Sequence, residues 1–258
     1  MTDYFRDPHV VSLRYRIEPS EGVTFGNDTW PIEREFDAFR LSVTHETATA
    51  HMKEHHATED EAREVVEGYL RRLEIFEAVR PMGTGVKFSF EEAEVVDRDP
   101  PPIYAAARAI PAIGSDARSE VVRELHLPDL TEVFAMSSDV EVMWNRYEGY
   151  LQEREPLPSM AYFCLTRFRS GAGNNKEAAS RYRVSKNVLD ELGKLASRSG
   201  DDTTARKWDS RHAHQPLTDT EREWVEDAVE LLIYRAGQYE ADPHREWPKI
   251  TMQHLPQL

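Results

Sequence analysis

Three consecutive prolines, Pro100 to Pro102, divide this chain into two parts whose hydrophobic patterns differ. Proline has no backbone N–H and a fixed φ, so the run continues neither a helix nor a central strand. Before it, apolar residues mostly alternate with polar ones, whereas after Ser137 they recur every three or four residues. We therefore expect an α+β domain, a connecting segment, an all-helical bundle and a surface tail. Their predicted ranges are 1–100, 101–136, 137–241 and 242–258.

The first part carries the strand signals. Residues 11–18 alternate apolar and polar side chains without a break, which predicts a half-buried strand. A second run predicts one long strand over residues 36–51, and residues 86–96 predict another. Between these last two, Thr58 and Glu61 have the spacing of a capping box, which starts a long helix. The order strand, strand, helix, strand indicates a mixed or antiparallel sheet with a helix covering one face.

Helix signals dominate the second part. They cover residues 137–153, 159–169, 174–195 and 218–236. Ser137 is a suitable N-cap for the first of these helices, and Thr218 with Glu221 forms a second capping box. Residues 130–136 are instead interpreted as a short strand. Together these patterns predict a bundle of about five helices.

The formal net charge of −15 is unevenly distributed along the chain. Residues 1–156 carry 17 Lys and Arg against 32 Asp and Glu, whereas residues 157–258 carry 15 of each. Within the second part, residues 167–211 hold 11 basic and 6 acidic side chains. A local basic patch on an acidic protein is typical of a nucleic-acid-binding surface, although solvated helix faces have the same composition.

The segment 174–195 resembles a helix-turn-helix. Small residues stand where the two helices would cross, and Val184 would lie in the core beneath the turn. In a DNA-binding regulator, Lys186, Asn187 and Lys194, together with Asp190, would face outward from the second helix toward phosphates or base edges. An ordinary corner between two bundle helices has the same pattern, so both interpretations stay open.

The loop that follows carries Arg206 and His212, with five residues between them. A helical bundle with this arrangement ahead of its last long helix resembles the HEPN superfamily, and the resemblance covers residues 137–241. It implies metal-independent RNA cleavage, without a cofactor, in a composite site formed by two protomers, in a defence or stress system. It also implies that His212 orients or deprotonates the ribose 2′-hydroxyl, and that Arg206 stabilises charge on the scissile phosphate.

The chemistry of the two side chains suits these roles. Histidine exchanges a proton near neutral pH, and arginine presents a fixed set of donors to an anionic phosphorane. We therefore expect RNA binding or endoribonuclease activity by a homodimer. The further residues expected to contact nucleic acid are Arg181, Arg183, Lys186, Asn187, Lys194, Lys207 and Arg211. A second pair with similar spacing, Arg40 and His45, falls on a predicted strand.

A non-catalytic role is the remaining alternative. The acidic segments 59–77 and 91–99 would then dock a basic protein partner. The densest histidine cluster comprises His45, His51, His55 and His56, but no third ligand accompanies them at a fixed spacing, so we expect no metal.

The expected location is the cytoplasm. The single cysteine, Cys164, lies in an apolar segment and rules out an internal disulfide, as is usual in a reducing compartment. No apolar run approaches the length that spans a bilayer, so we expect no membrane association.

Overall fold

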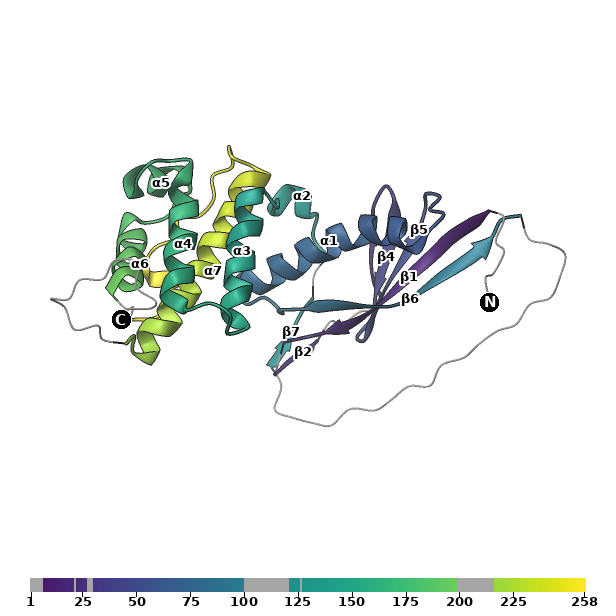
Figure 1. Ribbon diagram of the computed structural model, residues 1–258, viewed down its shortest axis with the longest axis horizontal. Helices are drawn as coiled ribbons and strands as arrows, with labels where there is room; N and C mark the ends of the chain where they lie inside the picture. The colour runs from purple at the N-terminus through teal and green to yellow at the C-terminus, as the bar shows by residue number, and fades with distance from the viewer. Residues whose placement is uncertain (1–6, 21, 27–29, 100–120, 126, 199–215) are drawn as a thin grey trace. The chain divides into compact units, whose positions relative to one another are not determined.

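The computed structural model describes residues 7–20, 22–26, 30–99, 121–125, 127–198 and 216–258. These residues form two compact units (Figure 1). The first comprises Met1–Ala78 and Met82–Leu127, and the second comprises Val79–Pro81 and Pro128–Leu258. A sheet with one long helix makes up the first unit and helices make up the second, so the predicted α+β class is confirmed.

The first unit is built on a five-stranded antiparallel sheet with the strand order β3-β4-β5-β1-β6. Its strands are β1 (Pro8–Glu18), β3 (Ile32–Glu35), β4 (Phe39–Val43), β5 (Thr47–Met52) and β6 (Lys87–Asp97). A separate parallel pair joins β2 (Val23–Phe25) to β7 (Val121–Arg123). Strand β1 pairs with β5 along one edge and with β6 along the other, so it joins β6 to the rest of the sheet.

The alternation in β1 has the expected consequence. Leu13, Tyr15 and Ile17 are buried, whereas Arg14 and Arg16 between them are exposed, because successive side chains of a strand point to opposite faces. The predicted half-buried strand is therefore confirmed.

The prediction of one long strand over residues 36–51 is wrong. Strand β4 ends at Val43 and β5 starts at Thr47, so the segment is a hairpin. Thr44 N donates to Thr47 O at 2.8 Å, and Thr44 Oγ1 accepts from Thr47 N at 3.1 Å. Threonine favours strands, but its hydroxyl also closes turns by bonding to nearby backbone groups, and here this second property decides.

Helix α1 (Glu59–Val79) covers one face of the sheet (Figure 1). The predicted capping box is present: Glu61 N donates to Thr58 Oγ1 at 3.3 Å, and Glu61 Oε2 accepts from Thr58 N at 3.3 Å. On the sheet side of the helix, the Tyr69 ring lies 4.4 Å from Phe36, and the Arg63 guanidinium lies 4.3 Å from the centre of the Phe90 ring. The predicted covering helix is confirmed.

The second unit is a helical bundle. Its helices are α2 (Leu130–Val133), α3 (Ser138–Leu151), α4 (Leu157–Ser170), α5 (Asn175–Arg181), α6 (Lys186–Arg198) and α7 (Asp219–Ala241), and a 3-10 turn, η1 (Met252–His254), follows. The N-cap at Ser137 and the capping box at Thr218 are present as predicted. Trp224 and Leu232 of α7 are fully buried, together with Met143 of α3 and Cys164 of α4, so the core lies between these helices. No helix among the described residues is long and apolar enough to cross a membrane.

The short strand predicted over residues 130–136 is wrong, because Leu130–Val133 is helical. The reason is tertiary. Phe134 is fully buried against Gly237 of α7, and Ala135 N donates to Gly237 O at 2.9 Å. Packing against α7 therefore decides the conformation of this segment, which the local pattern could not indicate.

The contact between Gly237 and Phe134 yields a stability prediction. A Cβ atom at position 237 would lie 2.2 Å from the nearest atom of the buried Phe134 ring. We expect Gly237→Ala to lower the free energy of unfolding by about 1–3 kcal/mol, because the core cannot accept the added methyl group without strain.

Gly68 in α1 is the matched control, since a Cβ at this helical position meets nothing within 4 Å. Gly68→Ala should raise the free energy of unfolding by roughly 0.5–1 kcal/mol. Urea denaturation of both variants measures the difference. Equal effects of the two substitutions would contradict the close packing at Gly237.

Candidate nucleic-acid interface

The predicted helix pair is present as α5 and α6. Asn174 caps α5, and its side chain accepts from Lys176 N at 2.9 Å and from Glu177 N at 3.0 Å. The turn between the helices contains Arg183, whose φ of 51° places its backbone in the left-handed region. Val184 is fully buried beneath the turn, as the pattern predicted. The α5–α6 corner is therefore a helix pair whose connecting turn is packed over a buried valine.

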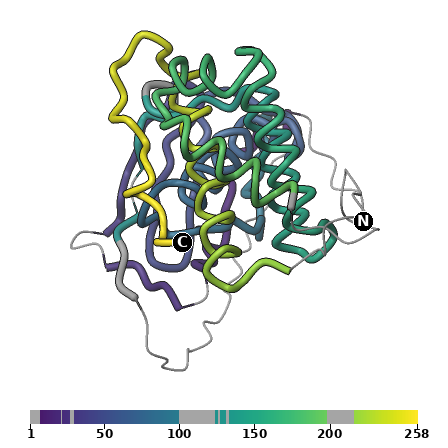
Figure 2. Tube along the Cα trace, turned by 90° about the vertical axis from the view of Figure 1, so that its left-hand side faces the viewer, coloured from purple at the N-terminus to yellow at the C-terminus, as the bar shows by residue number. Residues whose placement is uncertain are grey.

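The C-terminal tail fastens this corner to the bundle. Ile250 pairs with Val184 in a parallel bridge, in which Ser185 N donates to Ile250 O at 2.7 Å and Ile250 N to Arg183 O at 3.0 Å. Figure 2 follows this tail, in yellow, from the end of α7 to the C-terminus. Trp247, Ile250 and Leu255 of the tail are buried, so the segment is packed rather than loose.

A buried arginine completes the attachment. Arg235 of α7 is 4% exposed and donates to Tyr182 O at 3.2 Å and to Pro248 O at 2.6 Å. Burial lowers the pKa of Arg235 to about 10, so the side chain is still charged at neutral pH. The corner, α7 and the tail are thus held together by one guanidinium.

The three candidates on α6 face outward as predicted, but the two lysines have intrahelical partners. Lys186, Asn187 and Lys194 are exposed. Lys186 pairs with Asp190, and Lys194 Nζ lies 2.8 Å from Glu191 Oε1. Hydrogen bonds from Lys186 and then from Asn175 hold the pKa of Asp190 below its usual range. This face therefore presents cations and carboxylates side by side.

Arg181 and Arg183 form a second group. They are exposed, and they line a cavity of about 200 Å³ together with residues of the tail, whereas the α6 lysines do not line it. Arg206, Lys207, Arg211 and His212 lie outside the described residues. The two corner arginines thus share one cavity, and the α6 lysines contribute nothing to its lining.

The alternative pair, Arg40 and His45, belongs to the sheet. Arg40 is on β4, opposite His51 of β5, and the His45 ring lies 4.3 Å from the Trp30 ring in the following turn. The two residues therefore belong to the hairpin and its packing.

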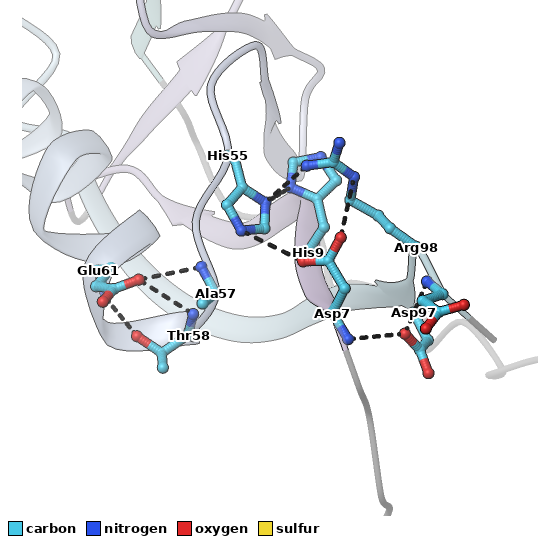
Figure 3. Close-up of polar contacts among 9 residues, drawn as sticks. Asp7, His9, His55, Ala57, Thr58, Glu61, Asp97 and Arg98 are labelled. Atoms are coloured by element: carbon cyan, nitrogen blue, oxygen red, sulfur yellow. Dashed lines mark hydrogen bonds and ion pairs between the residues drawn. The ribbon is translucent and has the colours of Figure 1, made fainter. Parts of the chain in front are cut away.

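In the structure, one histidine of the predicted cluster, His55, pairs with a histidine from outside the cluster. His55 stacks on His9, a residue of β1 that the sequence did not single out, with 5.3 Å between ring centres (Figure 3). His55 Nδ1 lies 3.2 Å from Arg98 Nη1, and its Nε2 lies 3.7 Å from Asp7 Oδ1. Because arginine only donates, His55 Nδ1 accepts, and the ring proton on Nε2 faces Asp7.

The same group affects the protonation of His9. Burial, followed by the neighbouring His55 and Arg98, lowers the pKa of His9. Among the residues that the structure describes, no three His, Cys, Asp or Glu side chains are arranged to hold a metal ion. The geometry here is that of a polar contact between β1, the segment that joins β5 to α1, and the residues at the end of β6.

The acidic segments of the sheet unit are partly balanced from within. Arg63 Nη1 lies 3.2 Å from Glu59 Oε1, and its Nε lies 2.7 Å from Glu67 Oε1. Arg14 on β1 pairs with Glu92 on β6 at 2.9 Å. Internal arginines thus neutralise part of the surface that would attract a basic partner.

Two tyrosine–carboxylate pairs between α3 and α7 were not apparent in the sequence. The Tyr147 hydroxyl donates to Glu230 Oε1 at 2.5 Å, and the Tyr150 hydroxyl donates to Glu226. Burial raises the pKa of Glu230 to about 7; the Tyr147 hydrogen bond opposes this, and Asp227 and Glu226 add to it. Because Glu230 bridges to Tyr147 of α3, this pKa makes the packing of α3 against α7 depend on pH.

Comparisons with known proteins do not extend these observations. The sequence matches no protein-family model, no curated protein and no solved structure. The functional argument therefore rests on the residues themselves.

The buried Glu230 predicts a pH dependence of stability. The folded protein binds this proton more tightly than the unfolded chain, whose carboxyl has an ordinary pKa near 4.5. The stability that the protonated Glu230 contributes is therefore lost as the pH rises from 4.5 through about 7. Glu230→Gln abolishes the titration and keeps an acceptor for Tyr147. The free energy of unfolding of this variant should exceed that of the wild type by about 1–3 kcal/mol at pH 8 and by much less at pH 5.

Urea denaturation at both pH values measures this effect. Glu141→Gln, which removes a carboxylate from the exposed side of α3, is the matched control and should shift stability equally at the two pH values. If Glu230→Gln also gave a constant difference, the buried carboxyl would not be the titrating group.

Proposed function

We propose that the protein binds single-stranded RNA through the α5–α6 corner and cleaves it as a metal-independent endoribonuclease. The corner is the observation that carries the proposal. Residues 174–198 contain six basic and three acidic side chains in a protein whose net charge is −15. This helix pair, which the C-terminal tail holds in place, exposes four basic side chains: Arg181, Arg183, Lys186 and Lys194. A rigid set of cations binds phosphates with little loss of side-chain and backbone freedom.

The distribution of charge on α6 favours a flexible strand over duplex DNA. A recognition helix in a major groove lies between two phosphate backbones, and Asp190 and Glu191 on this helix would be repelled by them. A single strand is flexible, so it can place its phosphates beside Lys186 and Lys194 and turn a base toward Asn187.

The catalytic part of the proposal follows from the resemblance to the HEPN superfamily. Arg206 and His212 would form half of a composite site, and Lys207 and Arg211 would hold the neighbouring phosphates. A second protomer would supply the other half. In this reaction His212 removes the proton from the 2′-hydroxyl, the 2′-oxygen attacks the adjacent phosphorus, and the bond to the 5′-oxygen breaks. The leaving 5′-oxygen takes up a proton from water, and His212 returns its proton to solvent. The products are a 2′,3′-cyclic phosphate and a 5′-hydroxyl, and the reaction takes place in the cytoplasm.

The binding step is tested with the α6 lysines. The double variant Lys186→Gln, Lys194→Gln should bind single-stranded RNA roughly tenfold more weakly than the wild type. The slope of log affinity against log salt should fall in magnitude by about 1.4, since each lost phosphate contact contributes about 0.7 for a single strand. Fluorescence anisotropy at several salt concentrations measures both quantities.

Lys87→Gln, at an exposed position on β6, is the matched control and should leave RNA affinity unchanged. Duplex DNA of the same sequence is the competitor. If the wild type preferred duplex DNA and the double variant lost its affinity for the duplex, a DNA-binding regulator would replace the RNA proposal.

The cleavage step is tested separately with end-labelled RNA in the presence of EDTA. His212→Ala should slow cleavage by a factor of about 10²–10⁴, the usual contribution of a general base, without loss of RNA affinity. Arg206→Ala should be similarly defective. RNA that the wild type binds but never cuts would remove the catalytic part and leave the binding part intact.

A further inference from the structure

A cavity of about 200 Å³ lies between the α5–α6 corner and the C-terminal tail. The end of α5 and the turn contribute Arg181 and Arg183, α7 contributes Tyr239, and the tail contributes His244, Arg245 and Trp247. Three arginines, from segments more than 60 residues apart in sequence, thus line one small space.

These guanidinium groups have little negative charge opposite them. The Arg245 guanidinium lies 4.3 Å from the centre of the Trp247 ring, and across the described part of the chain it pairs with no carboxylate. Arg183 has one carboxylate within reach, that of Glu246, at 3.9 Å. Glu246 is also the one acidic residue among the described residues that line the cavity, and its side chain is 89% exposed to solvent. The cavity therefore keeps an excess of positive charge.

The walls are fixed before any ligand arrives. The Tyr182 ring lies 4.2 Å from Phe168 and 4.8 Å from Tyr239, and Arg235 ties the Tyr182 carbonyl to the tail. Burial raises the pKa of Tyr182 and outweighs the opposing effect of its hydrogen bond with Arg181, so its hydroxyl keeps a proton to donate. The wall around Tyr182 is thus already ordered, which lowers the entropic cost of binding an anion there.

Size and charge together identify the class of ligand. The volume is below the roughly 300–1,000 Å³ of pockets for drug-sized molecules, and it equals about seven water molecules at roughly 30 Å³ each. A phosphate group with at most its sugar fits such a space. Arginine forks match phosphate oxygens, and a monoester carries more charge near neutral pH than the single charge of a backbone diester.

We propose that this cavity binds a phosphate monoester, supplied by the 5′ end of an RNA strand or by a free mononucleotide. The RNA source rests on the proposed function and deepens it. Arg183 stands three residues before Lys186, so a strand whose end sits in the cavity begins next to the α6 lysines.

The experiment compares one short single-stranded RNA with a 5′-phosphate and with a 5′-hydroxyl, using the full chain and fluorescence anisotropy. Adenosine monophosphate and inorganic phosphate are added as competitors, and their effect on the melting temperature is recorded. The wild type should bind the phosphorylated strand roughly tenfold more tightly than the other, and the mononucleotide should remove this preference.

Arg245→Gln should reduce the preference to less than twofold and leave the affinity for the 5′-hydroxyl strand unchanged. Lys249→Gln is the matched control, because it removes a charge from the same tail at an exposed position that does not line the cavity. Arg183→Gln, at an exposed turn position, should also reduce the preference if Arg245→Gln disturbs the packing on Trp247. Because Arg183 belongs to the proposed RNA-binding corner, its affinity for the 5′-hydroxyl strand should fall as well, and the ratio of the two affinities is the readout.

The two proposals can fail separately. Equal affinity for both strands, without a shift in melting temperature from the mononucleotide, would overturn the cavity site and leave RNA binding in place. A mononucleotide that stabilises the wild type but not Arg245→Gln, with neither RNA bound, would keep the cavity site and overturn the proposed function. A preference that persists in both arginine variants would place the phosphate elsewhere and overturn the assignment.

Discussion

The buried guanidinium of Arg235 is the interaction on which the candidate surface of the helical unit depends. It reaches two carbonyl groups, one at the end of α5 and one in the tail, that belong to segments far apart in the sequence. A buried charge is costly unless it is hydrogen-bonded, and an unpaired buried carbonyl is costly too, so each group stabilises the position of the others. The bridge between Val184 and Ile250 then fixes the register of the tail against the corner.

This attachment explains why the lysines of α6 and the arginines of the cavity have different electrostatic surroundings. On α6, each lysine lies one turn or less from a carboxylate on the same helix, so the ion pairs form locally and satisfy both partners. In the cavity, the arginines come from elements that only the tertiary structure brings together, and no comparable set of carboxylates accompanies them. Exposed local pairs contribute little to stability or binding, whereas three arginines with one carboxylate among them favour an anion from outside.

The same distinction separates what the sequence could predict from what it could not. The capping boxes at Thr58 and Thr218, the alternation in β1 and the burial of Val184 each depend on residues within a few positions of one another, and all were predicted correctly.

The features that were missed depend on contacts distant in sequence. Tyr147 meets Glu230 across 83 positions, and His9 meets His55 across 46, so no local pattern could indicate either pair. The segment 130–136 was assigned wrongly for the same reason, since the space beside Gly237 exists only once α7 has packed. Basic residues 181 and 183 were identified as candidates, but the cavity that they line is completed by residues of the tail.

An anchored end would let a modest surface bind a long strand. The α6 lysines are partly neutralised by their own carboxylates, so each adds little when it meets a phosphate that diffuses freely. A strand already held by its terminal phosphate presents the next phosphates to α6 at an effective concentration in the millimolar range, and weak contacts then suffice. The anchor also sets the register, because the position of the first phosphate fixes which later nucleotide lies beside Asn187. A terminal-phosphate cavity next to a weakly basic helix face is thus more selective for strand ends than a strongly basic face would be.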